Sequence, residues 1–145
     1  MTIREAYPAE IDLCLSIREA AFRAIVEQLQ PWNHDLERTN MIRRFSEQIV
    51  WIAEQDGKPC AYFAVGQEHA QTWLYQLFVS PEFQSQGIGA RILHFVVNLE
   101  RTPETRIRLK VLKHNHRAIA FYERHNWTRY EENDISFFYE SPPPI

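Results

Sequence analysis

Glycine, cysteine and long hydrophobic runs are all scarce in this chain of 145 residues. It holds four glycines and two cysteines, and no stretch approaches the roughly 18 apolar residues of a membrane-spanning helix. Cys14 and Cys60 lie far apart and match neither a Cys-x-x-Cys pair nor zinc-finger spacing, which argues against a structural metal. The N-terminal segment carries Arg4, Glu5 and Glu10 and lacks an apolar core, so we expect no signal peptide. The sequence therefore predicts a cytoplasmic protein with two buried free thiols.

The composition is that of one soluble globular domain. Hydrophobic residues make up 45%, charged residues 24% and aromatic residues 13%, which excludes a disordered or low-complexity chain. The net charge is −3, from 16 basic and 19 acidic residues, whereas proteins that grip nucleic acid or anionic membranes are basic. We expect neither as a partner. We expect one domain over residues 1–140 and a frayed tail over 141–145, where three prolines gather.

Hydrophobic periodicity predicts a mixed succession of helices and strands. The expected helices cover residues 11–31, 35–48, 87–101 and 115–125. The expected strands cover residues 3–6, 49–53, 60–67, 72–79, 105–111 and 135–139. This order, β-α-α-β-β-β-α-β-α-β, indicates a mixed sheet with helices on its faces.

Local signals add detail to this outline. Asp35 is a candidate N-cap for the second helix, and Asp56-Gly57 predicts a tight hairpin turn. The segment 72–79 is almost continuously apolar and aromatic, as expected of a central strand buried on both faces. The acidic run Glu131–Asp134 is expected to be a solvated loop before the last strand.

Two of the four glycines lie two residues apart, where the most apolar strand should meet the next helix. A glycine in a helix costs about 1 kcal/mol relative to alanine, so Gly87 and Gly89 need a reason. One reason is a ligand that approaches the backbone, because the free N–H groups of a helix start hold phosphate. The other is a plain strand-to-helix turn with close packing. The spacing is neither that of a P-loop nor that of a dinucleotide fingerprint.

Two segments carry a family resemblance. The loop Gln84–Ala90 matches the pattern Gln/Arg-x-x-Gly-x-Gly/Ala, and residues 111–124 contain Asn-x-x-Ala followed by Phe-Tyr-Glu. Together with Ile3–Ala6 and Ile17–Phe22, they make the chain resemble the GNAT superfamily of N-acetyltransferases over nearly its whole length. The resemblance implies an α/β (α+β) fold with a mixed, mostly antiparallel central sheet flanked by helices on both faces.

The resemblance also implies a reaction and a set of roles. Acetyl-CoA would donate an acetyl group to a primary amine that attacks the thioester directly in a ternary complex. The main chain of Leu77, Phe78 and Val79 should pair with the pantetheine arm. The amides that should cradle the pyrophosphate belong to Gln84, Ser85, Gln86, Gly87, Ile88, Gly89 and Ala90. Asn115 should hydrogen-bond the pantetheine or its surroundings, and Tyr122 should protonate the departing thiolate. The alternative for Tyr122 is a core aromatic role.

No motif in the sequence identifies the base that deprotonates the acceptor amine. Relatives carry glutamate at the positions that Trp73 and Lys110 occupy in this chain. Glu68, His69 and His114 remain as candidates, directly or through water, and each could equally be a solvated surface residue. The missing glutamates favour a small-molecule amine over a protein N-terminus. A protein or peptide acetyltransferase and a non-catalytic acyl-CoA-binding module are the alternatives.

Several residues keep two interpretations. Trp32, between the first two helices, would line the acceptor pocket or pack in the core. Arg117 would reach a CoA phosphate or lie on a solvated helix face. His114 and His116 have no third ligand nearby, so no metal is expected. The oligomeric state stays open, a homodimer included.

Overall fold

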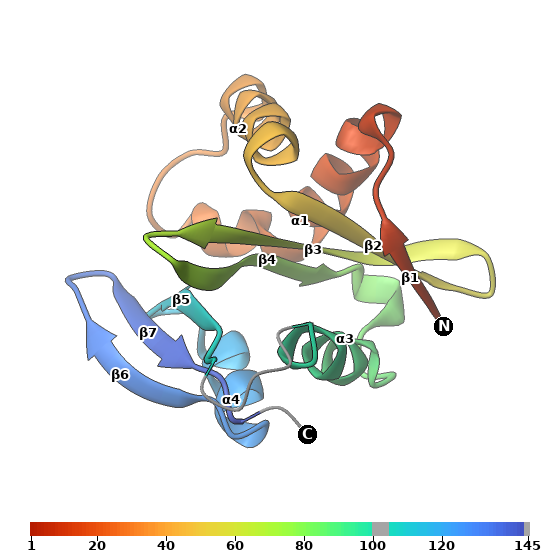
Figure 1. The fold of residues 1–145 in the computed structure, drawn as a ribbon. Coiled ribbons are helices and arrows are strands. Elements are labelled where there is room, and N and C mark those ends of the chain that lie inside the picture. Colours follow the sequence, from red (N-terminus) through yellow and green to blue (C-terminus); the bar gives the residue numbers. More distant parts are fainter. Residues whose placement is uncertain (100–104, 144–145) are drawn as a thin grey trace.

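The polypeptide is built around one seven-stranded sheet. The computed structural model describes residues 1–99 and 105–143, and the strands follow the order β1-β2-β3-β4-β5-β7-β6 (Figure 1). They are β1 (Thr2–Glu5), β2 (Ile49–Gln55), β3 (Lys58–Glu68), β4 (Gln71–Val79), β5 (Arg108–Leu112), β6 (Thr128–Glu132) and β7 (Ser136–Glu140). Strands β4 and β5 run parallel, and the other neighbouring pairs in the described residues are antiparallel. The predicted mixed, mostly antiparallel sheet is confirmed.

Helices cover both faces of the sheet. They are α1 (Ile11–Val26), α2 (His34–Glu47), α3 (Ile88–Val97) and α4 (His116–Arg124), with short 3₁₀ turns at Pro8–Glu10 and Pro81–Phe83. Helices α1 and α2 lie on one face and α3 and α4 on the other (Figure 1). Among the described residues, the core under α1 and α2 includes none from β5, β6 or β7. That face of these three strands therefore stays outside the core.

Most predicted elements are confirmed within a few residues, including the Asp56-Gly57 turn, where both residues have positive φ. Strand β6 was not predicted, because all its residues are exposed and none alternates with a buried neighbour. The prediction that Glu131–Asp134 form a solvated loop was therefore partly wrong, since Glu131 and Glu132 end this strand. The N-cap of α2 is Asn33, whose side chain accepts a hydrogen bond from the Leu36 amide at 3.0 Å, and not Asp35.

The element ends also differ from expectation. Helix α1 ends at Val26, five residues before Pro31, and β5 starts at Arg108 instead of 105. The last two residues of the expected helix 87–101 lie outside the described part of the chain. Ser141 is buried and its amide donates to the Ile107 carbonyl at 2.8 Å, so the chain is anchored at this residue. Residues 144–145 lie outside the described range.

A buried polar cluster joins α1 and α2 to the sheet. Arg18 Nε donates to Glu37 Oε1 at 2.7 Å, and another nitrogen of the same guanidinium donates to Gln76 Oε1 at 2.7 Å. The side chains of Arg18 and Glu37 are only 9% and 10% exposed. Arg44 lies at the same interface with one buried guanidinium nitrogen unpaired in the described residues, and burial lowers its pKa. The carboxylate of Glu37 is thus paired with the buried Arg18, and the half-buried Arg44 adds a second positive charge at this interface.

Both cysteines are buried and free, as predicted. Burial raises the pKa of the Cys14 thiol to about 12. A thiol with so high a pKa is neutral at physiological pH and acts as a small core residue.

Candidate active site

Strands β4 and β5 diverge and leave a V-shaped opening between them, the fork. They pair at Trp73 and Arg108 alone in the described residues, and beyond this point the two strands diverge. Residues Leu77, Phe78 and Val79 pair with β3 on their other side and are only half-buried. The prediction that this strand is buried on both faces is therefore wrong, since only Thr72 and Leu74 of β4 are buried. The main-chain edge of these residues that faces the fork has no strand partner among residues 1–99 and 105–143, so it offers hydrogen-bonding groups to an extended ligand.

A β-bulge lies where the fork begins. Ala64 pairs with Gln76 and Val65 pairs with Leu74, which leaves Tyr75 as an extra residue in β4. A bulge bends its strand and increases the local twist. We attribute the divergence of β4 from β5 to this bend.

The loop after β4 presents backbone amides at the start of α3. Ser85 and Gly87 both have positive φ, at 66° and 78°, and Gly87 is the N-cap of α3. No side chain in the described part of the chain caps this helix, so the amides of its first turn keep their hydrogen-bonding capacity. Gln84 Nε2 donates to the Val79 carbonyl at 3.0 Å and ties the loop to the end of β4. Ser85, Gln86 and Gly87 are exposed, whereas Ile88 anchors the helix in the core.

The two glycines of this loop lack side chains for different reasons. A Cβ at Gly87 would meet nothing within 4 Å, so this residue provides the left-handed backbone next to open space. A Cβ at Gly89 would lie 2.9 Å from Cζ of Phe121, a distance that real Cβ atoms do not reach. Gly89 therefore lets α4 pack against the first turn of α3. Of the two reasons weighed for the pair, close packing accounts for Gly89.

This contact places Tyr122 beside the loop. Its ring packs with Phe121, Trp127 and Tyr139, at centroid distances of 5.3, 5.8 and 6.5 Å. The residue is 8% exposed, and its hydroxyl has no hydrogen-bond partner in the described part of the chain. Burial raises the pKa of the phenol above its ordinary value. Tyr122 is therefore a neutral donor at physiological pH, with its proton uncommitted.

Asn115 occupies the N-cap position of α4. Its Oδ1 accepts a hydrogen bond from the Ala118 amide at 3.3 Å. The side chain thus starts the helix that carries Tyr122, a structural role that the sequence prediction did not include. His116 and Arg117 follow in the first turn and are exposed.

A pocket of about 520 Å³ lies where the fork begins. Its lining combines aromatic and charged side chains from β3, β4, β5, β7 and the β3–β4 turn, including Glu68, His69, Trp73, Tyr75, Arg108, Lys110 and Phe138. Trp73 packs edge-on against Phe138 at 6.4 Å and stacks on Tyr75 at 6.4 Å. The predicted base candidates Glu68 and His69 thus lie together in one pocket with Trp73 and Lys110.

Glu68 is held at this pocket by Tyr75. The Tyr75 hydroxyl donates to Glu68 Oε2 at 3.0 Å, and burial together with this carboxylate raises the pKa of Tyr75 to about 12. A Cβ at Gly66 would lie 3.0 Å from the Tyr75 ring, so the absence of a side chain there lets the ring lie over β3. His69 and Ala70 form the adjoining two-residue turn with φ values of 53° and 62°. Histidine tolerates positive φ better than most residues, whereas alanine does not, so the strain of this hairpin lies at Ala70.

His114 lies apart from the other base candidates. Its Nε2 lies 2.9 Å from the carbonyl oxygen of Ile25, a contact in which that nitrogen is the donor. The side chain thus links the β5–α4 connection to the last turns of α1. With Nε2 committed as a donor, His114 has a structural role.

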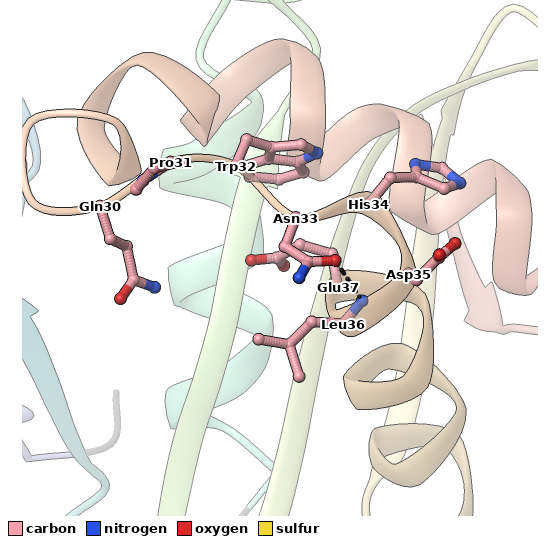
Figure 2. Close-up of a pocket in the computed structure, with 8 residues that line it drawn as sticks. All are labelled: Gln30, Pro31, Trp32, Asn33, His34, Asp35, Leu36 and Glu37. Atoms are coloured by element: carbon pink, nitrogen blue, oxygen red, sulfur yellow. Dashed lines mark hydrogen bonds between the residues drawn. The ribbon is translucent and has the colours of Figure 1, made fainter.

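A second pocket, of about 600 Å³, is lined by the connection between α1 and α2 and the start of α2 (Figure 2). Trp32 lines this pocket, and the guanidinium of Arg23 lies 5.9 Å from its ring centroid. Trp32 does not line the pocket at the fork, and its assignment to the acceptor pocket stays a prediction. The indole N–H of Trp32 is enclosed without a partner in the described residues. Glu37, which also lines this pocket, is committed to Arg18.

The acetyltransferase (GNAT) domain model matches residues 46–129. The chain belongs to the GNAT acetyltransferase family. The matched residues include β4 and β5, the loop Gln84–Ala90 with its exposed backbone amides, and most of the residues that line the pocket at the fork. These features of the GNAT chain thus lie in the part that matches the family.

Individual relatives are more distant. The [ribosomal protein bS18]-alanine N-acetyltransferase of Escherichia coli (strain K12) is 29% identical over 94 residues, which is 64% of this chain and 62% of the relative. The crystal structure of PaiA N-acetyltransferase from Thermoplasma acidophilum in complex with coenzyme A superposes with a TM-score of 0.78, at 13% identity and 97% coverage of both chains. The structure of the ribosomal-protein-S18-alanine N-acetyltransferase from Escherichia coli gives a TM-score of 0.72, at 21% identity, covering 99% of this chain and 94% of that one. These likenesses establish the GNAT fold.

The structure brings the two motifs of the GNAT chain into contact. The amide loop and the α4 block are separated in sequence, and they meet through Gly89 and Phe121. Sequence reasoning missed Tyr75, Arg108 and Phe138 as pocket residues, since only the bulge and the strand order bring them together. No group of three metal-ligating side chains occurs in the part of the chain that the structure describes. No helix within that part is long and apolar enough to cross a membrane.

Proposed function

We propose that this protein is an acetyl-CoA-dependent N-acetyltransferase that acetylates a primary amine of a small molecule. The observation that carries the proposal is the continuity of one surface. The unpaired edge of β4 leads into the exposed amides around Gly87, and helix α4 packs on the same loop with the buried phenol of Tyr122. Membership of the GNAT family supports this assignment.

The donor would bind along the fork. The main chain of Leu77–Val79 pairs with the pantetheine arm as with an added strand. The amides of Ser85–Ala90 hold the pyrophosphate, because the N-terminal end of α3 attracts negative charge and its first-turn N–H groups are uncapped. Arg91, exposed on the same helix, adds a positive charge close to this anion. Asn115 caps α4 and thereby positions Tyr122, and its side-chain amide nitrogen donates a hydrogen bond to the pantetheine.

The acyl transfer then needs three proton movements: two protons leave the acceptor nitrogen and one reaches the thiolate. Glu68, which has no cation partner in the described residues, removes the proton of the acceptor ammonium, directly or through water. The neutral amine attacks the thioester carbonyl, so a C–N bond forms and the C–S bond breaks. Tyr122 donates its phenolic proton to the departing thiolate. The second proton, which the attacking nitrogen releases as the amide forms, restores the phenol through solvent. His69, on the rim of the same pocket, is the alternative base.

A small acceptor fits the dimensions of the pocket. A volume of about 520 Å³ is within the range of small-molecule sites. The Escherichia coli relatives are named as enzymes that acetylate an alanine of a ribosomal protein, and a protein N-terminus is therefore the second candidate acceptor. A panel of free amines and peptides, assayed with acetyl-CoA by mass spectrometry, separates the two.

The donor site is tested by a matched pair of variants. Gly87→Asp introduces bulk and negative charge at the amide loop, whereas Gly57→Asp makes the same change in the β2–β3 turn. Both glycines have nearly equal φ, 78° and 77°, and both would direct a Cβ into open space. Calorimetry should show loss of CoA binding in Gly87→Asp and wild-type affinity in Gly57→Asp. Equal affinity in both variants would refute the donor site. CoA binding without acetylation of any amine would instead indicate a non-catalytic acyl-CoA-binding module.

A further inference from the structure

The pocket at the fork contains one anion and one cation that no other charge neutralises. Glu68 forms no ion pair in the described residues and is bound by the Tyr75 hydroxyl. Arg108 is neutralised by Glu140, whose Oε2 lies 3.1 Å from its Nε, and its guanidinium lies over the Tyr130 ring at 4.7 Å. Lys110 forms no ion pair with any described residue. The charges left to a ligand are thus the carboxylate of Glu68 and the ammonium of Lys110.

These two charges lie on opposite arms of the fork. Glu68 ends β3 and is tied to β4, whereas Lys110 lies in β5, next to Phe138 of β7. Lys110 and Arg108 alternate with the buried Leu109 and Val111, so they project from the face of β5 that no core cluster covers. Trp73 and Phe138 form an apolar wall in the same pocket. A ligand in this pocket therefore meets an anion on one arm, a cation on the other and aromatic rings in the middle.

We propose that the acceptor is a small zwitterion, an amine that also carries a carboxylate, as a free amino acid with an apolar side chain does. Its ammonium binds at Glu68, which removes the proton, and its carboxylate binds at Lys110. Its apolar part packs on Trp73 and Phe138. This inference rests on the proposed acetyltransferase function and specifies its acceptor. Lys110 is a specificity-determining residue in this scheme, since it takes no part in the bonds that form and break.

The chain offers a clean control, because it contains three lysines only: Lys58, Lys110 and Lys113. Lys113 is paired with Glu132, whereas Lys58 is exposed at the start of β3, the opposite end of that strand from Glu68. Lys58→Gln therefore removes the same charge as Lys110→Gln without touching the pocket. Lys110→Arg keeps the charge at the pocket and serves as the rescue variant.

The experiment measures kcat/KM for free apolar amino acids and for their methyl esters with acetyl-CoA. The ratio of acid to ester within each variant is compared between variants, which cancels the intrinsic reactivity of the two amines. We expect Lys110→Gln to lower this ratio about tenfold, the effect of losing one hydrogen bond between charged groups. Lys58→Gln and Lys110→Arg should keep the wild-type ratio, and CoA affinity should be unchanged in all three.

Three results would overturn the inference: equal use of acids and esters by the wild type, an unchanged ratio in Lys110→Gln, or acetylation confined to peptides or to amines without a carboxylate. Failure of the proposed function gives a different result. In that case calorimetry shows no CoA binding by the wild-type protein and no amine of any class is acetylated, which removes this inference as well.

Discussion

The two glycines at the start of α3 allow a sharp test of the packing between α3 and α4. An alanine at Gly89 would place a Cβ 2.9 Å from Cζ and 3.2 Å from Cε1 of Phe121, so the ring must move. Overpacking of this kind costs about 1–3 kcal/mol, and the better helix propensity of alanine returns about 1 kcal/mol. An alanine at Gly87 meets no atom within 4 Å but is forced to a φ of 78°, at a cost of about 1–2 kcal/mol.

Both single variants should therefore lose about 1 kcal/mol, for unrelated reasons, and Phe121→Leu should tell them apart. Shortening the ring removes the collision at residue 89 and does nothing for the backbone at residue 87. In a double-mutant cycle by urea unfolding, we expect a favourable coupling of about 1 kcal/mol between Gly89→Ala and Phe121→Leu. Gly87→Ala and Phe121→Leu should be additive within about 0.5 kcal/mol. Additivity of the first pair would refute the packing explanation for Gly89.

Three further predictions follow from buried groups. Tyr122→Phe should lower kcat about 100-fold and leave CoA affinity intact, because only the proton donor is lost; unchanged turnover would remove the phenol from the mechanism. Glu37→Gln should cost about 3 kcal/mol in urea unfolding, since Arg18 then stays buried without a carboxylate, and a loss under about 1 kcal/mol would contradict this. Burial raises the pKa of Tyr122 in the folded state, so its stabilising effect is complete below the unfolded pKa of about 10 and declines at higher pH. The free energy of unfolding should therefore decrease between pH 9 and pH 11, less steeply in Tyr122→Phe; identical slopes would be inconsistent with a buried phenol.

The sequence identified the parts of the fold that have a local signature. The hairpin at Asp56-Gly57 and the strand-to-helix glycines were predictable because each needs a residue type that tolerates positive φ. The block around Tyr122 was recognisable for its motif. Strand β6 has no comparable signal: it is an edge strand whose residues are all exposed, and only its pairing with β7 defines it.

The candidate site, too, was predictable only where a local motif marks it. Glu68 and His69 were named as base candidates without a reason to choose between them and His114. The choice depends on a hydrogen bond from Tyr75, which the bulge in β4 positions, and on the commitment of His114 to the Ile25 carbonyl, which joins residues that are distant in sequence. The reason for glycine at position 89, its close contact with Phe121, could not be predicted either, because it depends on how α3 packs against α4.

The interior position of the open β4 edge has a consequence for solubility. Exposed edge strands are templates for aggregation, because another polypeptide can extend the sheet there. In this fold the unpaired backbone of Leu77–Val79 lies between two parts of the same sheet, with β3 on one side and the diverging β5 on the other. A foreign strand, with side chains on both faces, has no lateral approach to it, whereas a slender unbranched chain can enter end-on. The protein thus keeps unsatisfied backbone groups available without inviting its own copies to polymerise on them.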